Sequence, residues 1–75
     1  MPFNEKDWNV AIDHLEKVLR ADANYSVAYL ALGKAYKGAG LKDKASSTWK
    51  EGISIAAKKG DLMPANQMQS ELQML

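Results

Sequence analysis

The chain has 75 residues, of which 47% are apolar and 25% charged, so it has the composition of one small folded domain. It contains no cysteine, which excludes disulfide cross-links, thiolate nucleophiles and cysteine-ligated metal sites. No apolar run approaches the roughly 20 residues that span a bilayer, and the first residues lack the basic flank and apolar stretch of a signal peptide. We therefore expect a cytoplasmic protein with no membrane partner.

The net charge of +1 does not favour binding to nucleic acid, but the charge is unevenly distributed. Residues 1–25 carry three basic and five acidic side chains, residues 26–59 carry seven and two, and residues 60–75 carry none and two. A basic centre between acidic ends suits head-to-tail self-association or an acidic partner. The same distribution also suits a plain solvated helix surface, so both interpretations stay open.

Four helical segments are predicted, and the first runs from about residue 5 to residue 21. Its apolar side chains recur at three- and four-residue steps and form one face. They are Trp8, Ala11, Ile12, Leu15, Val18 and Leu19. Asn4 is placed to cap this helix with Asp7 returning a bond, and Phe3 is placed to close a hydrophobic staple on Trp8.

The second helix is predicted from about residue 25 to residue 37, after a short polar connector at residues 22–24. It should end at Gly38-Ala39-Gly40, where glycine can adopt the left-handed conformation that closes a helix. Its core stripe comprises Ala28, Tyr29, Leu32, Ala35 and Tyr36.

The third helix is predicted from about residue 42 to residue 59, with Gly60 as its stop. Its buried side comprises Ala45, Trp49, Gly52, Ile53 and Ala56. The fourth starts after Asp61, a good N-cap, and tolerates Pro64 in its first turn. Its apolar face comprises Ala65, Met68, Leu72 and Leu75. Because no segment has the pattern of a strand and the connectors are short, we expect an all-α fold of antiparallel helix neighbours.

A 34-residue period organises the chain. Ala11 and Ala45 are 34 residues apart, and each lies four residues before a large apolar side chain. Residues 26–59 contain the pattern Tyr29-x2-Leu32-Gly33-x2-Tyr36, followed by Ala45-x3-Trp49. This pattern resembles the tetratricopeptide repeat (TPR), W-x2-L-G-x2-Y…A-x3-F…P, with exchanges at two aromatic positions. The closing proline is absent, and Ala57 stands in its place.

The resemblance implies antiparallel helix pairs stacked in a short right-handed superhelix. It implies one TPR-like domain over residues 1–75, with a half repeat at 1–25, a complete repeat at 26–59 and a capping helix at 60–75. The last helix departs from the family pattern. Asn66, Gln67 and Ser70 stand where leucine, glycine and tyrosine are expected, which is typical of a helix that solvates the end of a repeat array.

The resemblance also implies a concave groove that holds a peptide or helix of a partner protein. Carried onto this chain, the groove residues are Val27, Leu30, Lys34 and Lys37. Two lysines beside an apolar floor suit an acidic and hydrophobic peptide, although the lysines could equally serve solubility alone. Because Leu30 and Ala31 occupy positions where polar clamp residues are expected, we do not expect a clamp for C-terminal carboxylates. The leading function is therefore that of an adaptor or scaffold.

The alternative function is a self-assembling structural module. About three repeats are normally needed for stability, and the first helix lacks the partner it would have inside its own repeat. We expect self-association, as a homodimer or a higher homo-oligomer, through Trp8, Ile12, Leu15 and Leu19. Two other interpretations stay open: the chain is a fragment, or its C-terminal helix folds back over this face.

No catalytic constellation is visible, and we expect neither an enzyme nor a bound cofactor or metal. His14 is the only histidine, and it lies on a polar part of the first helix. Asp7 and Glu16 fall on different sides of that helix and cannot share a metal. RNA binding would need exposed stacking aromatics, whereas the aromatics here belong to the predicted core.

Overall fold

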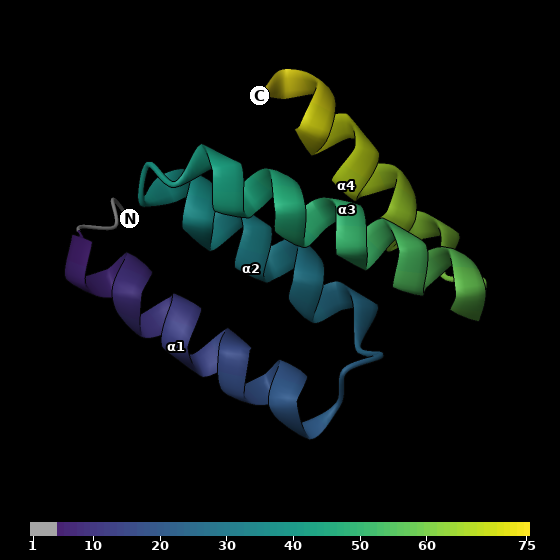
Figure 1. Ribbon diagram of the computed structural model, residues 1–75, viewed down its shortest axis with the longest axis horizontal. Helices are drawn as coiled ribbons and strands as arrows, with labels where there is room; N and C mark the ends of the chain where they lie inside the picture. The colour runs from purple at the N-terminus through teal and green to yellow at the C-terminus, as the bar shows by residue number, and fades with distance from the viewer. Residues whose placement is uncertain (1–4) are drawn as a thin grey trace.

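The computed structural model describes residues 5–75, with side chains from Trp8 onward. Among residues 5–75 there are four helices and no strand: α1 (Glu5–Ala21), α2 (Ser26–Gly38), α3 (Lys42–Lys59) and α4 (Leu62–Met74). Each helix packs on the next along the chain, and α4 also contacts α2 (Figure 1). The predicted all-α fold is confirmed, with α2 shifted by one residue. The expected Asn4 cap and Phe3 staple lie outside the described residues.

Two helices end in the same way, through a glycine with positive φ. Gly40 and Gly60 have φ values of 83° and 77°. The amide after Gly40 donates to the Tyr36 carbonyl, and the amide of Asp61 donates to the Ala56 carbonyl, both at 2.8 Å. These bonds satisfy carbonyls that a helix end would otherwise leave unpaired. They also reverse the chain sharply, so α2 lies against α3 and α3 against α4.

The contact between α2 and α3 is built around Trp49. Its side chain is fully buried, and its indole N–H donates to the Leu30 carbonyl at 3.2 Å. A Cβ added at Gly33 would overlap the indole ring, so the absent side chain lets α2 approach the tryptophan. The small residue and the aromatic side chain predicted from the repeat pattern therefore meet as one close contact.

The helix α4 is attached by a similar contact. Met68 is fully buried, and a Cβ at Gly52 would meet its sulfur and the Cβ of Tyr29. Ala65 is only 7% exposed. The glycine in α3 thus makes room for the methionine of α4, which confirms the prediction that Met68 and Ala65 lie in the core.

Candidate functional site

The groove residues predicted on α2 have different environments in the structure. Val27 is 50% exposed and Lys34 is also exposed. Leu30, in contrast, is only 8% exposed and belongs to the core cluster that includes Trp49 and Met68. The prediction that Leu30 forms an apolar groove floor is wrong, because its side chain is buried in the cluster that also contains Trp49 of α3 and Met68 of α4.

The second predicted groove lysine, Lys37, is engaged within the chain. Its ammonium lies 3.5 Å from the carboxylate of Glu71 on α4, and its side chain is 39% exposed. This ion pair joins two residues that are 34 positions apart, one repeat period. An isolated pair at this exposure stabilises the fold little, but it neutralises a charge that a ligand would otherwise meet.

A polar groove of about 420 Å³ runs between α2 and α4. It is lined by Lys34, Asn66, Gln67, Ser70 and Glu71. Asn66, Gln67 and Ser70 were assigned from the sequence only to a solvating helix, and their place in a groove was missed. One feature of the sequence could have predicted this groove. Lys37 and Glu71 carry opposite charges and are one repeat period apart, which indicates that α2 and α4 lie side by side.

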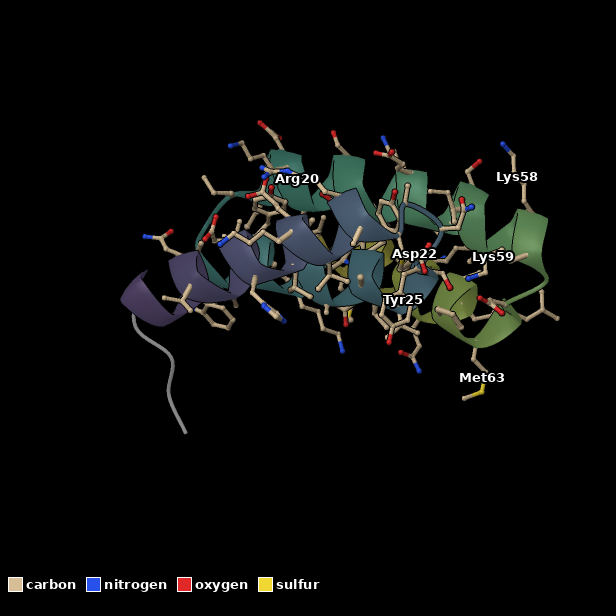
Figure 2. All side chains as sticks on the ribbon, turned by 90° about the horizontal axis from the view of Figure 1, so that it is seen from below. Arg20, Asp22, Tyr25, Lys58, Lys59 and Met63 are labelled. Carbon is tan, nitrogen blue, oxygen red and sulfur yellow. The ribbon has the colours of Figure 1, made fainter. Side chains whose placement is uncertain are left out.

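The groove region ends near exposed apolar side chains at the starts of α2 and α4. Tyr25 is 45% exposed and Met63 is 73% exposed, and Val27 follows one residue inside α2. Figure 2 shows Tyr25 and Met63 extending to the same side of the molecule, away from Arg20 and Lys58. The starts of α2 and α4 therefore offer exposed apolar side chains, and the groove between these helices offers amide groups.

Hydrogen bonds between loops hold these two helix starts together. The hydroxyl of Ser26, which is 1% exposed, donates to the Asp61 carboxylate at 2.7 Å. Lys59 donates to the Asn24 carbonyl at 2.6 Å and lies 3.5 Å from Asp61. Asp61 occupies the predicted N-cap position of α4 but makes no capping bond. The N-cap position predicted for Asp61 is confirmed, but its carboxylate accepts from Ser26 and so joins the start of α4 to the start of α2.

A crevice of about 280 Å³ lies on the other side of α2, between α1 and α3. It is lined by Glu16, Leu19, Arg20, Tyr29, Leu32, Thr48 and Glu51. Burial raises the pKa of Tyr29, and the nearby charge of Glu51 raises it further. Burial likewise raises the pKa of Tyr36, with additional contributions from the charge of Glu16 and the hydrogen bond to it. Both hydroxyls therefore stay neutral and act as structural donors, with Tyr36 bonded to Glu16 at 3.3 Å.

The four residues predicted for self-association lie on the side of α1 that meets α2. Ile12, Leu15 and Leu19 pack against the core cluster. The Trp8 ring lies over Gly38, where an added Cβ would overlap it. All four side chains are half-buried within a single chain. Much of this face is thus covered by α2. Ala11 and Val18 are half-buried as well, and Val10 is 69% exposed.

Among residues 5–75, no cluster of three or more histidine, aspartate or glutamate side chains is arranged to hold a metal ion. His14 is exposed on α1. Within the same range, no helix combines the length and the apolar character needed to cross a membrane.

Antiparallel helices related by a 34-residue period, with glycines at the helix contacts, define a helical-repeat protein. The profile of the tetratricopeptide repeat family matches residues 3–75. The chain is also 34% identical, over 58 residues, to a TPR repeat-containing protein of Pseudomonas aeruginosa. The alignment covers 77% of this chain and 55% of that protein, so the chain spans about half the length of this curated relative. No solved structure matches the chain.

The chain belongs to the tetratricopeptide repeat family. The family consists of protein–protein interaction modules that are generally not catalytic. The resemblance found in the Tyr29–Trp49 pattern is therefore confirmed.

Proposed function

We propose that this chain is an interaction module that holds an extended, acidic segment of a partner protein in the groove between α2 and α4. The observation that carries this proposal is the chemistry of the groove lining. Lys34 is exposed on one wall, and among the side chains of residues 8–75 its ammonium takes part in no ion pair. Asn66, Gln67 and Ser70 stand on the other wall. The expected cytoplasmic location and the absence of catalysis are part of the same proposal.

This lining suits the backbone of an extended peptide. Carboxamides donate and accept hydrogen bonds at once, as a peptide group does, so Asn66 and Gln67 match either edge of a peptide strand. Lys34 supplies one cation for a carboxylate, while Lys37 is already neutralised by Glu71. Exposed Val27 and Met63, at the helix starts, supply apolar contacts for a hydrophobic side chain of the same segment.

A peptide panel tests the proposal. Twelve-residue peptides that combine acidic and apolar residues would be titrated into the labelled protein, with amide shifts followed by NMR. We expect shifts at Lys34, Asn66, Gln67 and Ser70. Lys34→Glu should weaken binding by about fivefold to tenfold, because it replaces an attraction with a repulsion at the groove rim. Lys50→Glu, an exposed change on α3, is the matched control and should leave the affinity nearly unchanged.

Two results would contradict this proposal. One is an equal affinity for acidic and charge-reversed peptides, and the other is amide shifts located away from α2 and α4. A loss of binding shared equally by Lys34→Glu and Lys50→Glu would also count against the groove. It would mean that net charge, and not the position of one lysine, determines the affinity.

Self-assembly stays the competing proposal. The half-buried state of Trp8, Ile12, Leu15 and Leu19 leaves part of each side chain for a second copy. Such an association would use α1 and would not need the α2–α4 groove, so the two functions are separable by mutation.

A further inference from the structure

The helices α2 and α4, which form the walls of the groove, run in the same direction and nearly in register. At their starts, the Ser26 hydroxyl donates to the Asp61 carboxylate at 2.7 Å, across a separation of 35 residues. In their later turns, the Lys37 ammonium lies 3.5 Å from the Glu71 carboxylate, across 34 residues. Because both contacts join corresponding turns, positions along one wall can be compared directly with positions along the other.

Each wall carries an exposed apolar side chain two helical turns before a polar residue of the groove. On α2, Val27 is 50% exposed and lies seven residues before Lys34. On α4, Met63 is 73% exposed and lies seven residues before Ser70. Residues seven apart lie on the same side of an α-helix and about 10.5 Å apart along its axis. Both walls therefore present an apolar contact and a polar contact in the same order and at the same spacing.

The polar end of this arrangement attracts a negative charge. Lys34 is exposed and supplies the positive charge of the groove lining, whereas the negative charge of Glu71 is paired with Lys37. A carboxylate of the ligand is therefore attracted to Lys34. An apolar side chain of the ligand would lie against Val27 and Met63, so the groove favours a ligand that holds these two groups about 10 Å apart on one side.

The backbone conformation of the ligand decides which of its residues have this spacing. In a polyproline II helix, side chains three residues apart lie on the same side and about 9 Å apart. In a β-strand, side chains on one face are two or four residues apart, which corresponds to about 7 or 13 Å. Among extended conformations, polyproline II therefore comes closest to the spacing that the groove requires.

An α-helical ligand also has the required spacing, at residues seven apart, but it does not match the chemistry of the groove lining. The backbone amides and carbonyls of a helix are bonded to one another, so Asn66 and Gln67 would find only side chains to bind. A polyproline II backbone has no internal hydrogen bonds. Its carbonyls can therefore accept from the carboxamides of Asn66 and Gln67.

We propose that the groove recognises a partner segment in the polyproline II conformation, with an apolar residue and an acidic residue three positions apart. The proposal rests on the proposed function and specifies the segment that the same groove binds. The apolar residue lies against Val27 and Met63, and the acidic residue pairs with Lys34. Proline is tolerated at the two positions between them, because it keeps the carbonyl that Asn66 and Gln67 bind. It also fixes the backbone near the bound conformation, which lowers the entropic cost of binding.

A spacing series tests this motif. Twelve-residue peptides would carry one leucine and one glutamate, placed two, three, four or seven positions apart, in both orders along the chain. In the order that binds better, we expect the affinity to be highest at a spacing of three, by about threefold or more over the other spacings. Proline at both intervening positions should raise the affinity about threefold over glycine, since it reduces the ordering cost. Isothermal titration calorimetry measures the affinities, and amide shifts locate the peptides on the protein.

Two variants of the protein test the two contacts. Val27→Ser should weaken binding of the spacing-three peptide by about threefold to tenfold and make the affinities across the series nearly equal. Val10→Ser, at an exposed position on α1, is the matched control and should leave the series unchanged. With Lys34→Glu, the peptides should bind only when lysine replaces their glutamate, and the preference for a spacing of three should persist. Circular dichroism checks that each variant is folded.

Different results would reject the motif and the proposed function. Equal affinity at every spacing, with shifts at Lys34, Asn66 and Gln67, would reject the motif and leave the groove as a site for acidic peptides. A maximum at two or four would indicate a β-strand and a maximum at seven a helix, and either would overturn the polyproline II conformation. Tighter binding with glycine than with proline would overturn it as well. Absence of groove shifts with every peptide would reject the proposed function itself.

Discussion

Trp49→Ala is expected to lower the free energy of unfolding by about 3–5 kcal/mol, the usual effect of truncating a fully buried aromatic side chain. Ordinary domains are stable by about 5–15 kcal/mol, and one with so short a chain lies near the lower end. The variant should therefore be largely unfolded or on the edge of unfolding at room temperature. Urea unfolding followed by far-ultraviolet circular dichroism measures the loss.

The effect is this large because Trp49 makes two kinds of contact at once. It fills the space between α2 and α3, and its indole N–H bonds the Leu30 carbonyl at 3.2 Å. Trp49→Phe is the matched control: it keeps most of the ring volume but removes the donor, and should cost about 1–3 kcal/mol. If Trp49→Ala were no worse than Trp49→Phe, the indole would not be the centre of the core.

Gly33→Ala is expected to lower the free energy of unfolding by about 1–3 kcal/mol. The added Cβ would overlap the Trp49 ring, so α2 or the indole must move. Helix propensity alone would predict the opposite, a gain in stability, because alanine is favoured over glycine inside a helix by about 1 kcal/mol. Thermal or urea unfolding of the single variant measures the net effect.

A double-mutant cycle separates the two contributions. In a Trp49→Leu background the overlap is removed, so adding Gly33→Ala should be neutral or stabilising, as propensity alone dictates. The coupling between the two positions should then be at least about 1 kcal/mol. Equal effects of Gly33→Ala in both backgrounds would show that the glycine has no role in the approach of α2 to Trp49.

The helix pair α2–α3 could be predicted closely because its determinants are local and repeat. Glycine stops, three- and four-residue apolar steps and the small residue opposite an aromatic one all appear in the sequence itself. The predicted stop of α2 at Gly38-Ala39-Gly40 is confirmed, and Gly40 is the glycine that adopts the positive φ. The Tyr36 carbonyl accepts from the amide after Gly40, which selects that glycine.

The candidate site was harder to predict because it depends on contacts between repeats. Leu30 lies outside the core stripe predicted for α2, yet its side chain is buried in the cluster with Trp49 and Met68. Asp61 has the right position for a cap, but Ser26 on another helix provides a closer donor. Asn66, Gln67 and Ser70 show only polarity in the sequence. Their place in a groove follows from the position of Lys34 across from them.

The structure differs from the sequence-based prediction in how the apolar face of α1 is covered. The sequence predicts that Trp8, Ile12, Leu15 and Leu19 need cover from a second copy. In the structure Ile12, Leu15 and Leu19 pack against the core, and Trp8 lies over Gly38. Ala11 and Val18 on the same helix are half-buried as well. Self-association through the predicted residues stays a prediction.

Light scattering on a sizing column, over about a hundredfold dilution, tests most directly whether the protein alone presents open binding surfaces. We predict a folded monomer at the chain mass of 8.3 kDa, because Ile12, Leu15 and Leu19 already pack against the core within one chain. A dimer that persists on dilution and is dissociated by Val18→Arg would contradict this account, and would establish self-assembly as the role of the α1 surface.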